Sequence, residues 1–298
     1  MASVRHETYA ENATPSWMGR LYSAQGAAIA VASIIGLMVS MMAAVVVVDD
    51  AQQLFQPGGE HGFYAVIPHG LMVTIFGSVF VVAVMSIVAS SLRFWSRIQS
   101  SGRQTALAVG DGLETLDAVA RLRYLDGGGD GCPTQSDRPT HGRRRLHHLV
   151  FYGFMLCFAS TSVATLYHYL LGWPAPYPIL SVPVVLGTVG GLAMVIGCIG
   201  ILRDRSRRDP ALVVQDHRAM DLGFVVLLLA VAATGLVLLV LRDTRFMPLS
   251  LIVHLASVMA LFLLLPYSKF VHGIYRALAL LHYSREKRQP NPFASADS

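Results

Sequence analysis

Residues 222–241 read LGFVVLLLAVAATGLVLLVL, a run of twenty positions without one charged side chain. A helix of about twenty apolar residues is long enough to cross a ~30 Å hydrocarbon core. Five further runs have the same character, whereas the strands of a membrane β-barrel would be short and alternating. The sequence therefore predicts an all-α, polytopic membrane protein with six transmembrane helices, at residues 26–48, 67–92, 149–171, 181–202, 222–241 and 249–267.

The composition of the whole chain excludes an ordinary soluble enzyme. Of the 298 residues, 54% are hydrophobic and 14% are charged, and the mean hydropathy is +0.52. Soluble domains carry about 25% charged residues. The first apolar run follows a polar stretch and ends at Asp49 and Asp50 without a small-residue cleavage motif, so we expect a retained span rather than a signal peptide.

Basic residues indicate how the spans are oriented. Of the 23 Lys and Arg, 21 lie in residues 1–25, 93–146, 203–220 and 268–298, and the opposite loops hold only Arg242 and Arg245. Because basic loops stay in the cytoplasm, we expect both termini to be cytoplasmic, in a bacterial inner membrane. The formal charge of +5 follows from this bias and needs no nucleic-acid partner.

The spans and loops divide the chain into five predicted parts. Short loops between spans three and six favour antiparallel neighbours in one four-helix bundle. The parts are an N-terminal cytoplasmic tail (1–25), a transmembrane hairpin (26–92), a cytoplasmic loop (93–146), the four-helix bundle (147–276) and a C-terminal cytoplasmic tail (277–298).

The cytoplasmic loop and the fourth span each carry a recognisable pattern. From Thr105 to Tyr124, apolar residues recur at helical spacing with acidic residues among them, which predicts an amphipathic surface helix. Such a helix either lies on the bilayer or on other loops, or serves as a docking element. In the fourth span, Gly187 and Gly191 favour close helix packing, although a flat macrocycle against the backbone would need the same small residues.

Histidines near the spans are the candidate functional residues, because ionisable residues in a membrane are rare and usually functional. His254 and His272 are 18 residues apart, which corresponds to five turns of one helix and about 27 Å along its axis. They would share one face and lie near opposite membrane surfaces, although a kink at Pro266 would change this estimate.

The third span carries a matching set, with His147 and His148 at its cytoplasmic start and His168 at its outer end. Because spans three and six run antiparallel, His168 would meet His254 on the outer side. On the inner side, His147 or His148 would meet His272. Paired neutral imidazoles across a bundle are suitable axial ligands for the iron of haem b. The pattern favours two haems, although a helix-bridging hydrogen bond would explain any single histidine.

His69, at the outer start of the second span, has three alternative roles: to shape a quinone pocket, to bind a haem in place of His168, or to cap its helix. Tyr267, Lys269 and Arg276 are further candidates for a quinone site near the inner end. Basic residues at a helix end are more often membrane anchors. A metal-transport path is a weaker explanation of the histidines, since the spans lack the Asp and Glu that usually accompany one.

The cysteines limit which other redox groups the chain could hold. Cys132, Cys157 and Cys198 form no C-x-x-C motif. This excludes a cysteine-ligated iron–sulfur cluster within these residues, and also a covalently attached c-type haem.

Several segments carry a family resemblance. They read FYAVIPH at 63–69, RLRYLD at 121–126, RRLHHLVFYGF at 144–154 and KFVHGIYR at 269–276. Together they resemble the tricarballylate utilization protein B, or citrate utilization protein B, family over nearly the whole chain. The spacing of His254 and His272 is also similar to that in the cytochrome b subunit of respiratory nitrate reductase.

The family resemblance implies a membrane electron-transfer subunit of a quinone-linked oxidoreductase. Its partner would be a separate FAD-dependent tricarballylate dehydrogenase, whose electrons pass through iron–sulfur clusters and b-type haem to the quinone pool. Family members usually begin with a cysteine-rich domain carrying two 4Fe–4S clusters, which is missing from these residues. The iron–sulfur part would then be a separate protein or would have been lost by truncation.

Two other functions are alternatives at this stage. A tricarboxylate transporter would need an inverted repeat and polar or broken helices near the midplane, and the three-span halves show no convincing internal similarity. A passive membrane anchor would hold the dehydrogenase without carrying electrons.

Overall fold

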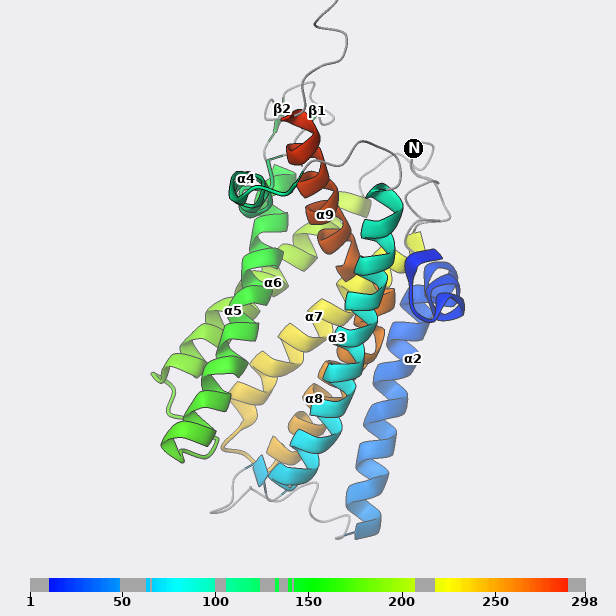
Figure 1. Ribbon diagram of the computed structural model, residues 1–298. Helices are drawn as coiled ribbons and strands as arrows, with labels where there is room; N and C mark the ends of the chain where they lie inside the picture. The colour runs from blue at the N-terminus through cyan, green and yellow to red at the C-terminus, as the bar shows by residue number, and fades with distance from the viewer. Residues whose placement is uncertain are drawn as a thin grey trace, which may run out of the picture.

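Helices dominate the computed structural model, which describes residues 11–48, 63–64, 66–99, 106–123, 132–133, 139–140, 142–206 and 218–288. Two short strands, β1 (Cys132–Pro133) and β2 (Pro139–Thr140), pair antiparallel. The helices in Figure 1 are α2 (Ser16–Val48), α3 (His69–Gln99), α4 (Val109–Ala120), α5 (Gly142–Leu171), α6 (Val182–Ser206), α7 (Arg218–Leu241), α8 (Met247–Leu264), the single turn η5 (Leu265–Tyr267) and α9 (Phe270–Lys287).

The six predicted spans are confirmed as long apolar helices. In the described residues, α2, α3, α5, α6, α7 and α8 have the length and composition needed to cross a membrane. Several extend beyond their apolar runs, because Arg favours helix as strongly as most apolar residues do. Arg97, Arg144 and Arg205 lie in such extensions, at the end of the spans drawn uppermost in Figure 1. This end is termed the arginine-rich end.

The sixth span does not continue as one helix to His272. Helix α8 ends at Leu264, η5 follows, and α9 begins only at Phe270. Pro266 lies in η5, where its missing N–H and its ring disrupt the α-helical hydrogen bonds. The prediction that His254 and His272 share one face of a helix is therefore wrong, because the two residues belong to different helices.

Helix α8 has the largest number of buried residues among the described helices, and three of the other spans pack against it. Helices α2 and α7 pack along α8, and α3 contacts both α8 and α9. On the other side, α5 packs along α6, and α6 packs along α7. Over the described residues, α5 and α8 do not pack along one another, so spans three to six form an open series. The predicted domain limits remain a prediction.

Glycines allow close packing between α5, α6 and α7. A Cβ atom on Gly190 would lie 2.8 Å from the Gly153 carbonyl oxygen, and one on Gly197 would lie 2.7 Å from Val150. A Cβ atom on Gly191 would lie 3.2 Å from Leu236 of α7. Neighbouring helices fill the space beside these glycines, so close helix packing explains them and contact with a macrocycle does not.

Candidate functional site

At the end of the spans opposite the arginine-rich end, His69 lies against His168. Their ring centroids are 3.9 Å apart and their planes differ by 25°, which is a stacked arrangement. His69 is the first residue of α3, and His168 lies in the last turn of α5. Tyr64 presents its edge to both rings, with centroid distances of 5.0 Å to His69 and 5.9 Å to His168. The structure thus brings His69 to the same place as His168.

His254 lies in α8 and is held by α7. The Thr234 hydroxyl donates to the Ala230 carbonyl at 2.6 Å, so its oxygen can accept from Nδ1 of His254, 3.1 Å away. A neutral imidazole that donates through Nδ1 keeps the lone pair on Nε2. A Cβ atom on Gly235 would lie 3.0 Å from the ring of His254, so the glycine makes room for it. Contacts with α7 therefore hold the ring of His254 in place.

At the arginine-rich end, His272 of α9 lies near His147 of α5. Burial, together with the nearby charges of Lys269 and Arg276, lowers the pKa of His272 to about 4. The carboxylate of Asp221 opposes this effect, and the charge on a protonated His147 would reinforce it. His272 is therefore neutral at physiological pH, which is the form that binds metals.

Two of the histidines have buried ring nitrogens without a hydrogen-bond partner in the described part of the chain. These atoms are Nε2 of His148 and Nδ1 of His168. A buried polar atom that lacks a partner is costly, so each one requires an explanation. The structure brings His147 towards His272. The ring centroid of His148 lies 5.7 Å from that of Tyr152. It leaves open which of the two would be the inner ligand.

The candidate quinone residues near η5 have structural partners. The Tyr267 hydroxyl donates to the Thr14 carbonyl at 3.1 Å, which ties the N-terminal segment to η5. The Lys269 ammonium lies 2.6 Å from a carboxylate oxygen of Asp221. The structure therefore supplies packing roles for Tyr267 and Lys269, and their assignment to a quinone site remains a prediction.

Two imidazoles from separate helices would suit a group held between them. Among the described residues, no three His, Cys, Asp or Glu side chains form a metal-binding group. Haem iron requires only two axial histidines. Directly packed helices lie about 8–10 Å apart, which leaves no room for a macrocycle between them. Helix α5 carries His168 and helix α8 carries His254, and these two helices do not pack along one another. Within the described residues, there is no ring contact or hydrogen bond between the two histidines.

Two features of the site were missing from the sequence analysis. The support of His254 by Thr234 had no sequence signal, because a threonine within a span ordinarily bonds to its own helix. Tyr64 lies in the segment FYAVIPH together with His69, so that segment did contain a signal for the aromatic contacts.

Comparison with known proteins identifies the family of this chain. A family model described as citrate utilization protein B matches residues 20–293. A curated protein from Escherichia coli named citrate utilization protein B is 43% identical over 290 residues, covering 97% of this chain and 75% of that protein. No solved structure matches significantly. Since both matches cover most of the chain, this chain belongs to the citrate utilization protein B family.

Proposed function

We propose that this chain is the membrane subunit that carries electrons from a cytoplasmic FAD-dependent dehydrogenase to the quinone pool through b-type haem. The dehydrogenase would act on tricarballylate or a citrate-like acid. The observation that carries the proposal is the gathering of histidines from separate helices at the two ends of the spans. The name of the family supports a role in the use of such acids.

The residues of the chain would hold one group at each end of the spans. His254 with His168 would hold the group at the end opposite the arginine-rich end, with His69 beside it. His272 with His147 or His148 would hold the group at the arginine-rich end. Haem b would supply a reversible one-electron carrier at each level. The apolar helices between the two levels would exclude water and ions.

Electrons would enter at the arginine-rich end, and the distribution of basic residues supports a cytoplasmic location for this end. The three cysteines form no cluster-binding motif, so a separate iron–sulfur protein or domain would transfer the electrons from the flavin. The chain would thus be one subunit of an oxidoreductase rather than a self-sufficient enzyme.

Thr234→Val should weaken haem binding at His254 by about 10- to 100-fold, the usual cost of losing a hydrogen bond that orients a metal ligand. Valine has nearly the same shape but cannot accept the Nδ1 hydrogen of His254. Thr234→Ser keeps the oxygen and should bind haem as the parent protein does. The measurement is haem titration of each purified variant, with the midpoint potential as a second readout. Equal affinity and potential in both variants would show that Thr234 does not orient a ligand.

The proposed route to quinone can be tested with purified protein in liposomes. Under anaerobic conditions, a quinol added to the oxidised protein should reduce its b-type absorption bands, because electron transfer with quinone is reversible. A passive anchor would show no such reduction. If quinol does not reduce the bands although haem is bound, the proposed electron transfer to quinone is wrong and the haem assignment is unaffected.

A further inference from the structure

One face of α4 carries apolar residues that point away from the protein. Val109, Leu113, Leu116 and Ala120 are spaced by four, three and four residues, which places them in one stripe along the helix. Val109 is 82% exposed, Leu113 is 63% exposed and Leu116 is 67% exposed. These four residues are termed the α4 stripe.

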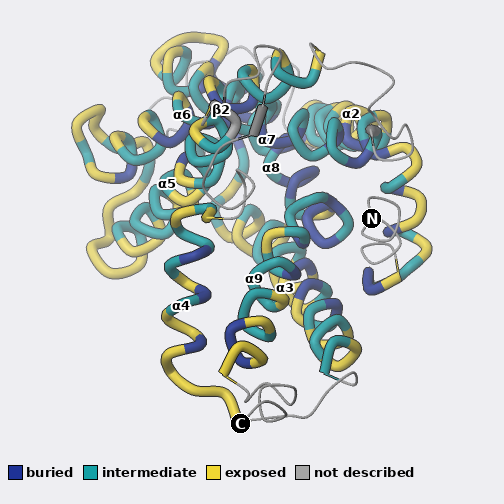
Figure 2. The backbone as a smooth tube through the Cα atoms, turned by 90° about the horizontal axis from the view of Figure 1, so that it is seen from above, coloured by how far each residue is buried: buried dark blue, intermediate teal, exposed yellow. Residues whose placement is uncertain are grey.

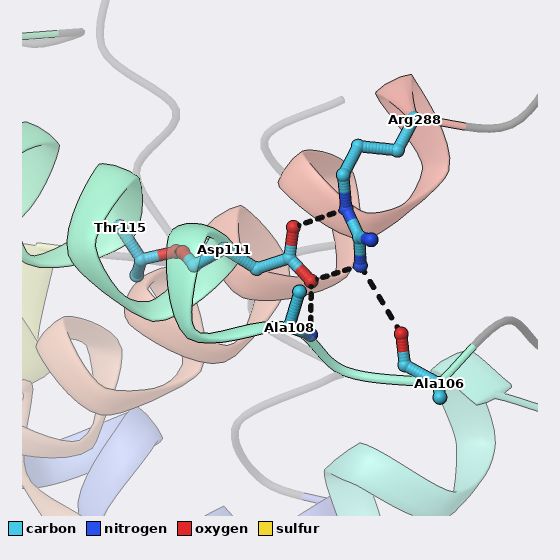
Figure 3. A network of polar contacts seen from close by, with 5 residues as sticks. All are labelled: Ala106, Ala108, Asp111, Thr115 and Arg288. Carbon is cyan, nitrogen blue, oxygen red and sulfur yellow. Dashed lines mark hydrogen bonds and ion pairs between the residues drawn. The ribbon is translucent and has the colours of Figure 1, made fainter.

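The opposite face of α4 is polar and is buried against α9. Asp111 is only 2% exposed and accepts hydrogen bonds from Arg288, including one of 2.6 Å from Nε (Figure 3). The amide of Ala108 donates to the same carboxylate at 2.9 Å, and the Thr115 hydroxyl donates to the Asp111 carbonyl oxygen at 2.7 Å. The bond from Arg288 and that from Ala108 lower the pKa of Asp111 and keep it ionised. This network fixes the rotation of α4 with its apolar face outward.

The remaining acidic residues of α4 are also paired. Glu114 lies 3.3 Å from the ammonium of Lys287, and Asp117 lies 2.6 Å from the guanidinium of Arg121. With Asp111 bound to Arg288, every carboxylate of α4 has a basic partner. The stripe is therefore not flanked by unpaired negative charge that anionic lipid headgroups would repel.

The position of α4 is that of a helix lying in the membrane plane. Figure 1 shows α4 end-on, at the arginine-rich end, while the spanning helices are seen from the side. In Figure 2 it is seen lengthwise at the edge of the molecule, with exposed residues along it. The Tyr152 hydroxyl donates to the Ala120 carbonyl at 2.9 Å. Tyr152 lies eight residues further into α5 than Arg144, in the part of the helix where interfacial tyrosines are common.

We propose that α4 is an interfacial helix whose α4 stripe inserts into the lipid leaflet at the arginine-rich end of the spans. The partner is the boundary between the headgroups and the acyl chains, where amphipathic helices bury an apolar face. Three features suit that environment: the stripe is exposed, the carboxylates elsewhere on α4 are paired with basic residues, and α4 lies beside α5. The inference depends on the placement of α4 and not on the presence of haem.

Lipid insertion would also place α4 where it steadies the inner histidines. Its buried face binds Arg288 and Lys287 at the end of α9, and its C-terminal end binds Tyr152 of α5. These are the helices that carry His272 and His147. The helix therefore links α9 to α5 at the membrane surface.

Photocrosslinking in native membranes tests this proposal. The photoreactive residue p-benzoylphenylalanine would replace Leu113 or Leu116, both of which are exposed enough to accept its larger ring without a clash. Glu286, an exposed residue near the end of α9, is the matched control position. After irradiation, mass spectrometry would identify what is attached to each position.

Lipid adducts are expected at Leu113 and Leu116, at a yield several-fold above that at Glu286. Adducts to a separate polypeptide at both stripe positions would overturn the proposal and identify the stripe as a protein-docking face. Lipid yields no higher than at Glu286 would also overturn it, because the stripe would then face water.

Discussion

Replacing His254 or His272 by Ala should in each case remove about half of the bound haem, since each residue would ligate one of two irons. The two residues belong to different helices and lie towards opposite ends of the spans, so neither can replace the other. The measurement is the molar ratio of haem to purified protein. In addition, imidazole should restore haem to His254→Gly, because a small ligand can occupy the space left by the ring; a misfolded protein would not recover in this way.

His282→Ala is the matched control for these two variants. His282 lies on α9 as His272 does, but its Nδ1 lies 3.5 Å from a carboxylate oxygen of Glu286. Its ring is also nearly perpendicular to that of Trp95, with the ring centroids 6.2 Å apart. It should keep the full amount of haem. Full retention of haem in both His254→Ala and His272→Ala would show that α8 and α9 do not provide the ligands.

His168→Ala should likewise remove about half of the haem, whereas His69→Ala should retain it and shift one midpoint potential. The buried Nδ1 of His168 has no hydrogen-bond partner in the described residues, which favours His168 as the ligand. Because the two stacked rings are 3.9 Å apart, only one of them could bind the iron. His69 would then shift the midpoint potential of the haem that His168 binds. Haem content and a potentiometric titration of each variant provide the two readouts.

Tyr169→Phe is the control for the outer variants, because it keeps the aromatic ring whose centroid lies 5.2 Å from that of His168. Haem content and both potentials should be unchanged. The reverse outcome, with haem lost in His69→Ala and kept in His168→Ala, would assign the outer ligand to His69.

The spans could be predicted from sequence because a membrane imposes a minimum length of apolar helix. For α7, the predicted range 222–241 differs from Arg218–Leu241 only at the arginine-rich end. Pro266 was a visible signal for distortion, but the sequence could not distinguish a kink from a complete break. The break also depends on Ser268, whose hydroxyl accepts a bond of 3.3 Å from the amide of Phe270 as α9 begins.

The candidate site was predictable as a set of histidines but not as a set of pairs. The stacking of His69 on His168 depends on how α3 and α5 are rotated, which helical periodicity within one segment does not determine. The same limit applies to α4. Its amphipathic pattern predicted a surface helix, but the burial of the polar face depends on Arg288, which is 177 residues away from Asp111.

The reduced-minus-oxidised absorption spectrum of the purified protein tests the central claim most directly. If this chain carries electrons through haem, the spectrum should show the α band of b-type haem, with about two haems bound to each chain. A protein that keeps its helical circular dichroism but shows no b-type band after expression with adequate haem supply would rule out electron transfer through haem in this chain.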